Sequence, residues 1–136
     1  MTWTLEYVST LRIIELVFAG KTTGPDLKEA TTKGIALTKE HGIVEVLIDT
    51  TEMEWAASTS DIYDLPVKQY VAENLDRRSR LAVVLSKLPK EKEVLLFYET
   101  VCTNYGWHVQ TFPNRDEAIE WLRGTDSSNK PDAGDG

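Results

Sequence analysis

Acidic and hydroxyl side chains follow an apolar run at residues 45–60, which read EVLIDTTEMEWAASTS. These residue types are compatible with three kinds of chemistry. Clustered carboxylates bind hard cations, and a carboxylate can also act as a general base. A serine at the start of a helix caps the helix or accepts a regulatory phosphate. The types alone do not decide among the three.

The first kind of chemistry is metal binding, which depends on the spacing of the carboxylates along the chain. Asp49, Glu52 and Glu54 come at the end of the apolar run, where open α/β sheets usually place ligands. Their spacing matches no known metal loop, and a protein cage for Mg²⁺ or Ca²⁺ needs several converging oxygens that one loop rarely supplies. We therefore expect solvated carboxylates and no metal.

The second kind of chemistry is catalysis by a nucleophile that is paired with a base. Cys102 falls on the apolar side of a predicted helix, where a thiol usually behaves as a small hydrophobic group. His108 begins a predicted strand, which places it at the opposite rim of a parallel sheet from Asp49 and Ser58. The sequence therefore predicts no catalytic residues, no cofactor and no enzymatic activity.

The elements that would position these residues follow from hydrophobic periodicity. Helical patterns cover residues 25–41, 58–75, 87–106 and 115–123. Pro66 lacks an amide donor, so the second helix either begins near Asp64 or is kinked there. Asn114 with Glu117 has the spacing of a helix N-cap. Strand patterns cover residues 2–8, 11–20, 43–48, 80–86 and 107–112.

This order of elements predicts an α/β fold. Its sheet is a single, mostly parallel, five-stranded sheet with an antiparallel edge hairpin and about four helices. We expect one domain over residues 1–124 of the 136 residues and a disordered polar tail over residues 125–136, because the last stretch is almost without apolar side chains.

Charge and composition exclude other classes of protein. The formal net charge is −7 and the pI is about 4.8, which disfavours binding to nucleic acid. No apolar run approaches the roughly 20 residues of a membrane span. The single cysteine cannot form an internal disulfide, and residues 1–10 have no signal-peptide pattern. These features favour a cytoplasmic protein.

Residues from about Leu5 to Leu122 resemble the STAS superfamily, and within it the SpoIIAA-like branch of small bacterial proteins. The resemblance is carried by the segments LIDTTEM, RLAVVLS and FPNRDEAIEWL. It implies an α/β fold that works by binding other proteins or small ligands and needs no cofactor. The same fold is similar to that of CRAL-TRIO lipid-binding domains.

The resemblance also suggests a regulatory site. In anti-anti-sigma factors, a serine within an Asp-Ser-Ser-Gly motif begins the helix after the third strand and is phosphorylated by a partner kinase. The matching positions here are near Ser58 and Ser60, but Ala57 replaces the aspartate and Ser60 the glycine. Ser58 and Ser60 are therefore candidates for a phosphorylation switch or for a helix cap.

Two functions stay open at this point. The first is a non-enzymatic interaction or regulatory module with a protein partner. The second is binding or sensing of a small apolar, lipid-like ligand in a pocket between helices and sheet. The partner or the ligand remains unidentified, and a homo-oligomer is compatible with the sequence. The candidate ligand or partner surface comprises Asp49, Glu52, Trp55, Tyr63 and Tyr70, and Phe97 and Tyr98 are further candidates for the pocket lining.

Overall fold

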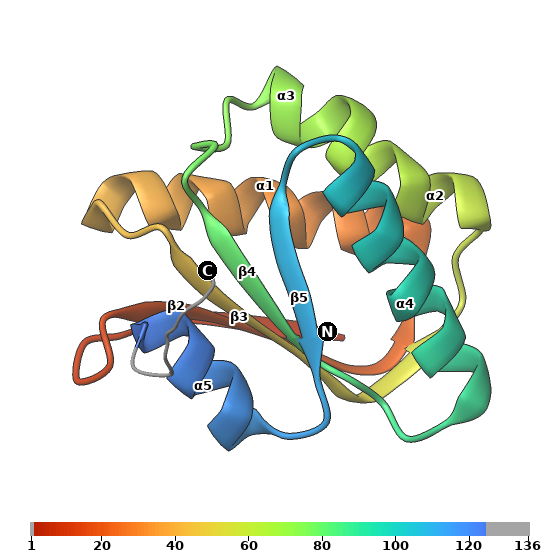
Figure 1. Cartoon of the computed structure of the whole chain (residues 1–136). Coiled ribbons are helices and arrows are strands. Elements are labelled where there is room, and N and C mark those ends of the chain that lie inside the picture. Colours follow the sequence, from red (N-terminus) through yellow and green to blue (C-terminus); the bar gives the residue numbers. More distant parts are fainter. Residues whose placement is uncertain (1, 125–136) are drawn as a thin grey trace.

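The computed structural model of the chain describes residues 2–124. Five strands form one sheet in the order β1-β2-β3-β4-β5 (Figure 1). β1 and β2 are antiparallel, and the other neighbouring pairs are parallel. The predicted α/β class and the edge hairpin are thus confirmed, whereas the predicted tail lies outside the described residues. The strands are β1 (Trp3–Val8), β2 (Ile13–Thr22), β3 (Glu45–Trp55), β4 (Arg80–Val84) and β5 (His108–Phe112).

Four helical segments cover the two faces of the sheet. Three of them connect successive parallel strands that lie side by side, and right-handed crossovers place all three on the same face. The last segment follows β5 and covers the other face (Figure 1). The segments are α1 (Gly24–His41), then α2 (Thr59–Asp64) continued by η1 (Leu65–Gln69) and α3 (Tyr70–Ala72), then α4 (Pro89–Asn104), and finally α5 (Arg115–Arg123).

Each face of the sheet has its own hydrophobic core. The larger core lies between the sheet and the three crossover segments, and it includes Phe18, Trp55, Tyr70, Tyr98 and Trp107. The smaller core lies beneath α5 and is formed by Ile13, Leu47, Ala82, Val84, Phe112, Ala118 and Leu122. The first core therefore positions every crossover helix, including the one that begins after β3.

β3 is longer than the sequence predicted. We expected it to end near Ile48, but it continues to Trp55 and pairs there with the end of β2. A bulge opposite Val17–Ala19 absorbs one extra residue of β3. After the bulge, Met53 and Trp55 are buried while Glu52 and Glu54 are exposed, the alternation of a strand with one covered face. The acidic residues thus belong to the strand and do not follow it.

The helix after β3 begins at Thr59, so a start near Asp64 is wrong and an irregularity at Pro66 is confirmed. The irregularity is a π-helical turn in which the Tyr70 amide donates to the Leu65 carbonyl. The wider turn tolerates the missing proline donor. It also leaves the Pro66 carbonyl to accept a 3.0 Å hydrogen bond from the indole nitrogen of Trp107. Long-range packing therefore supports this turn.

Candidate interaction site at the junction of β3 and α2

Ser58 is the N-cap of α2. Its backbone is extended, and its Oγ accepts a hydrogen bond from the Asp61 amide at 3.1 Å. The Asp61 carboxylate in turn accepts from the Ser58 amide at 2.9 Å, which completes a capping box. The Ser60 hydroxyl lies 3.0 Å from that of Ser58, and both serines are exposed. The sequence prediction of a cap is confirmed, and both hydroxyls remain open to solvent.

The start of α1 lies directly against this cap. Gly24 is buried, and a Cβ atom there would lie 2.6 Å from a carboxylate oxygen of Asp61. Hydrogen bonds from the Ser58 amide and hydroxyl lower the pKa of Asp61, and the charge of Lys28 on α1 adds to this shift. The ends of two helices therefore meet at one ionised carboxylate.

The first turn of α4 holds the other side of the junction. The carboxylate of Glu91 is buried and accepts a hydrogen bond from the Trp55 amide at 2.8 Å. The Lys90 ammonium donates to the Trp55 carbonyl at 3.0 Å. We refer to these hydrogen bonds of Glu91 and Lys90 with the Trp55 backbone as the clasp. Sequence reasoning missed the clasp, although an acid in the first turn after Pro89 was a signal of a helix start. The end of β3 is consequently fixed just before Ser58.

The predicted surface residues do not all gather at this junction. Asp49 lies at the bulge, where its carboxylate accepts from the amide of Thr51 at 2.9 Å and from its hydroxyl at 2.7 Å. Glu52 is exposed on the same strand, and Tyr63 is exposed on α2. Trp55 and Tyr70 are buried. Of the five predicted surface residues, Glu52 and Tyr63 are therefore the exposed ones, and Asp49 is half-buried.

Trp55 and Tyr70 line an apolar cavity beneath α2, together with Tyr98. A second cavity shares Tyr70 and lies toward α1. Each encloses about 40 Å³, enough for a small number of water molecules and far below the roughly 300 Å³ of a typical ligand pocket. Tyr63 and Phe97 line neither cavity. These volumes do not favour the apolar-ligand alternative.

Cys102 lies in the core beside the tyrosine pair of Tyr70 and Tyr98, whose hydroxyls are hydrogen-bonded to each other. Burial raises the pKa of the Cys102 thiol to about 12, so the reactive thiolate is suppressed at neutral pH. Burial also raises the pKa of both tyrosines. The prediction that Cys102 is a packing residue is confirmed.

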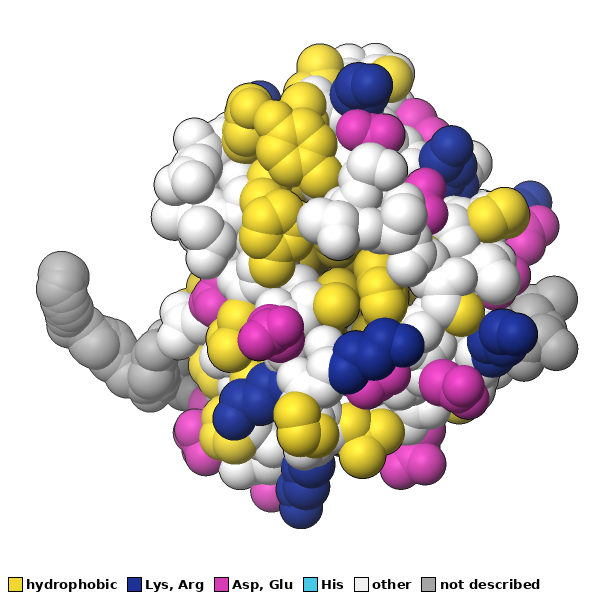
Figure 2. Space-filling view, turned by 90° about the vertical axis from the view of Figure 1, so that its right-hand side faces the viewer, with side chains coloured by type: hydrophobic (Ala, Val, Ile, Leu, Met, Phe, Trp, Pro, Cys, Tyr) yellow, Lys and Arg dark blue, Asp and Glu magenta, His cyan; other side chains and the backbone are white. Residues whose placement is uncertain are grey.

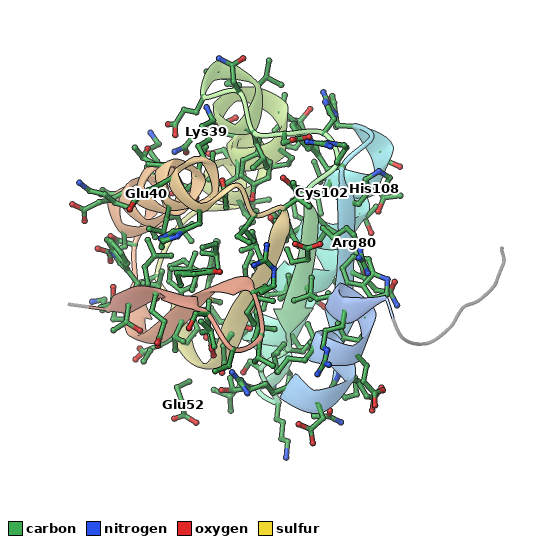
Figure 3. All side chains as sticks on the ribbon, turned by 90° about the vertical axis from the view of Figure 1, so that its left-hand side faces the viewer. Lys39, Glu40, Glu52, Arg80, Cys102 and His108 are labelled. Atoms are coloured by element: carbon green, nitrogen blue, oxygen red, sulfur yellow. The ribbon has the colours of Figure 1, made fainter. Side chains whose placement is uncertain are left out.

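The remaining candidates lie at the opposite rim of the sheet. His108 pairs with Arg80 and Arg80 with Glu45, at the ends where the parallel strands begin. Figure 3 shows Glu52 at one rim and Arg80 and His108 toward the other. The expected separation of His108 from the acidic stretch is therefore confirmed.

The three arginines near that rim have separate structural partners. Arg77 stacks on the ring of Trp107, with its guanidinium carbon 3.8 Å from the ring centroid. Arg78 forms a salt bridge with Asp76 at 2.7 Å. Arg80 donates to the carbonyl of Leu122 at 3.0 Å. The three arginines therefore form no common anion site.

Among residues 2–124, no group of three or more histidine, cysteine or acidic side chains could hold a metal ion. In the same range, no helix has both the length and the apolar character that crossing a membrane requires.

The sequence of the chain matches a known protein family. The family model named SpoIIAA-like matches residues 13–123. The chain belongs to the SpoIIAA-like family. The matched region runs from the start of β2 to the last residue of α5 and includes the junction of β3 and α2. No curated protein matches this SpoIIAA-like chain.

Solved structures share the SpoIIAA-like fold at low sequence identity. The anti-sigma factor antagonist SpoIIAA in its unphosphorylated form is 17% identical, with a TM-score of 0.55 over 90% of this chain and 98% of its own. The Bacillus cell fate determinant SpoIIAA in the phosphorylated form is 16% identical, with a TM-score of 0.54 over 88% and 98%. A DUF3478 protein from Shewanella loihica PV-4, uncharacterized and with a SpoIIAA-like fold, is 19% identical, with a TM-score of 0.57 over 88% and 91%.

Proposed function

We propose that this SpoIIAA-like chain is a non-enzymatic regulatory module that binds a protein partner at the junction of β3 and α2, with Ser58 as its switch. One observation carries the proposal. Ser58 combines an exposed hydroxyl with the N-cap position of α2, and contacts from α1 and α4 fix the backbone on both sides of it. A change of charge at Ser58 would therefore act on a well-ordered surface.

The solved relatives support a regulatory role. SpoIIAA is an anti-sigma factor antagonist, and its structures include an unphosphorylated and a phosphorylated form. The resemblance to anti-anti-sigma factors implies that Ser58 and Ser60 lie near the position of the phosphorylated motif of those proteins. The differences at Ala57 and Ser60 imply that the partner here is recognised by other contacts than in those proteins.

The absence of catalysis in this proposal rests on geometry. General acid/base or nucleophilic catalysis needs a pair of groups within hydrogen-bond reach. His108 lies at the rim opposite the acidic stretch, and the Cys102 thiol is buried with a raised pKa. The carboxylates of Asp61 and Glu91 are engaged in capping and in holding Trp55. The two carboxylates therefore have structural roles.

Phosphorylation of Ser58 would change the junction in two opposing ways. A phosphate adds roughly −1.5 to −2 charges at pH 7, and the free amides at a helix start favour it. The same phosphate would lie beside the ionised carboxylate of Asp61, which accepts from the Ser58 amide. The capping box would loosen, and an acidic partner surface would be repelled.

Three substitutions separate the charge of Ser58 from its capping role. Aspartate and asparagine are both good N-caps, whereas alanine is not. We expect Ser58→Asp to weaken binding of a partner recovered with the wild-type chain by about tenfold or more. Ser58→Asn should bind as the wild type does, and Ser58→Ala should chiefly lose stability, by about 0.5–2 kcal/mol.

Calorimetric titration would measure the affinities, and mass spectrometry of the chain from its own cells would locate the phosphate. Ser60→Asp is the matched control for position, since its hydroxyl lies 3.0 Å from that of Ser58 but does not accept the Asp61 amide. Equal affinities of Ser58→Asp and Ser58→Asn would reject the switch.

A further inference from the structure

Three exposed aromatic side chains form a strip along α2 and α4. Tyr63, Phe97 and Tyr105 are 37%, 39% and 45% exposed, respectively. The hydroxyls of Tyr63 and Tyr105 are hydrogen-bonded at 2.9 Å, and their rings meet edge to face. Figure 2 shows hydrophobic side chains gathered on the side of the molecule that these helices form. We refer to Tyr63, Phe97 and Tyr105 as the aromatic strip.

The strip is separate from the core of the protomer. Phe97 lies on α4 and Tyr105 is its C-cap, eight residues later, which places the two side chains about two turns apart along the helix and about 80° apart around it. The buried side chains of α4, among them Leu95, Tyr98 and Cys102, face the sheet instead. Clustered exposed aromatic rings mark interaction surfaces more often than isolated ones do.

Opposite charges lie at the two ends of the strip. Glu93 is exposed one helical turn before Phe97. Arg77 lies at the other end, where its guanidinium donates to the Tyr105 carbonyl at 2.8 Å. Within residues 2–124, neither Glu93 nor Arg77 forms a salt bridge with an oppositely charged side chain. The strip therefore has at its two ends an acidic and a basic side chain without a salt-bridge partner among residues 2–124, although the Arg77 guanidinium also contacts Trp107 and Tyr105.

The aromatic strip of a second copy of the same chain is complementary in charge to the first strip. Residues 93 and 105 are separated by about 18 Å along α4. A two-fold axis near the middle of the strip reverses the direction of the second helix, so each acidic end meets a basic end. The aromatic rings of the two copies then cover one another between the charges. Charge complementarity thus favours a second copy over an unrelated partner.

We propose that the aromatic strip is the interface of a two-fold symmetric homodimer, in which Glu93 of each protomer pairs with Arg77 of the other. The dimer goes beyond the regulatory role and does not depend on the Ser58 switch. Its interface rests mainly on one helix, so we expect a weak dimer with a dissociation constant on the order of 10–100 μM.

Sedimentation equilibrium at physiological salt tests the dimer on the full chain. The key variant is Phe97→Asp, and Leu96→Asp is its matched control. Leu96 is the neighbouring residue, 41% exposed against 39% for Phe97, and around the helix it points about 100° away from Phe97 and about 180° away from Tyr105. We expect Phe97→Asp to raise the dissociation constant by about tenfold or more, with Leu96→Asp unchanged. Equal effects of the two variants would contradict the proposed face.

Charge reversal tests the pairing directly. Glu93→Arg and Arg77→Glu should each weaken dimerisation by several-fold, and the double variant should recover much of the loss because it restores opposite charges across the axis. Circular dichroism would confirm that the Arg77 variant, which loses its contact with Trp107, still folds. A wild-type chain that stays monomeric at about 1 mM would overturn the proposal.

Discussion

α1 begins in the same way as the segment formed by α2, η1 and α3. The two are stabilised differently. Both start with a capping box, formed by Thr23 and Asp26 in α1 and by Ser58 and Asp61 in α2. α1 then runs for 18 residues and ends at Gly42, whose left-handed conformation caps its last turn. The second segment changes after six residues to a π-helical turn and a short α3.

Contacts from other elements hold the second segment in place. Trp107 donates its indole hydrogen to the Pro66 carbonyl, and the hydroxyls of Tyr70 and Tyr98 are bonded to each other. Gln69 also donates to the Lys28 carbonyl of α1 at 3.0 Å. Helices shorter than about 12 residues are marginal on their own. A capping box therefore starts both helices, but α1 continues as one regular helix, whereas the second segment is irregular and depends more on contacts with distant residues.

The largest expected effect comes from Trp107→Phe. The variant leaves the buried Pro66 carbonyl without its donor and loses part of the ring, which should cost about 2–3 kcal/mol of unfolding free energy. Urea unfolding would measure the cost, and amide exchange would show its location. We expect protection to fall in residues 59–72 well before it falls in α1. Trp121→Phe, on the α5 face, is the matched control.

An intermediate effect is expected at the contact between the two helix starts. Gly24→Ala would bring a Cβ atom to 2.6 Å from the Asp61 carboxylate and displace it from the cap of α2, at a cost of about 1 kcal/mol. In an Asp61→Ala background the obstacle is gone, so Gly24→Ala should cost almost nothing. Thermal unfolding of the four proteins in this double-mutant cycle would show the coupling. Additive costs would mean that the two helix starts are independent.

The smallest effect is the dependence of both caps on pH. Hydrogen bonds from the Thr23 amide lower the pKa of Asp26, and those from the Ser58 amide lower that of Asp61, each from an ordinary value of 3.8. A lowered folded-state pKa stabilises the fold above the ordinary value, and this contribution is lost as pH falls below 3.8.

An NMR titration of the two carboxyl groups would check this pH dependence. Because both side chains are open to solvent, the change in stability should be small. Ser58→Ala should raise only the pKa of Asp61, and Thr23→Ala only that of Asp26. A cross-effect between the two sites would indicate that the helix starts titrate as one unit.

Local signals in the sequence predicted the regular elements well. Pro25 and Gly42 delimit α1, and Asn114 caps α5 by accepting from the Glu117 amide, all as expected from residue type and spacing. The position of Ser58 as a cap also followed from local chemistry. Each of these features depends on atoms within a few residues along the chain.

Features that depend on distant residues were not predictable in this way. The second half of β3 exists because β2 continues alongside it beyond the bulge. The π-helical turn is supported by Trp107, 41 residues from Pro66, and the Glu91 clasp on Trp55 spans 36 residues. The aromatic character of Trp55 made it a candidate for the ligand or partner surface, whereas the structure buries it in the larger core. Pairing between distant segments has no signature in a single sequence.

The strand order has a consequence for how the sheet grows during synthesis. Each strand pairs only with the strands made just before and just after it, so every new strand can join an existing edge as it emerges. β1 stays at one edge of the growing sheet, the newest strand forms the other edge, and β5 is the last to join. There the Glu99 carboxylate of α4 accepts a hydrogen bond from the Thr111 amide at 3.0 Å. The helix made immediately before β5 thus occupies one outward amide of the last strand, which disfavours the pairing of a further strand at that position.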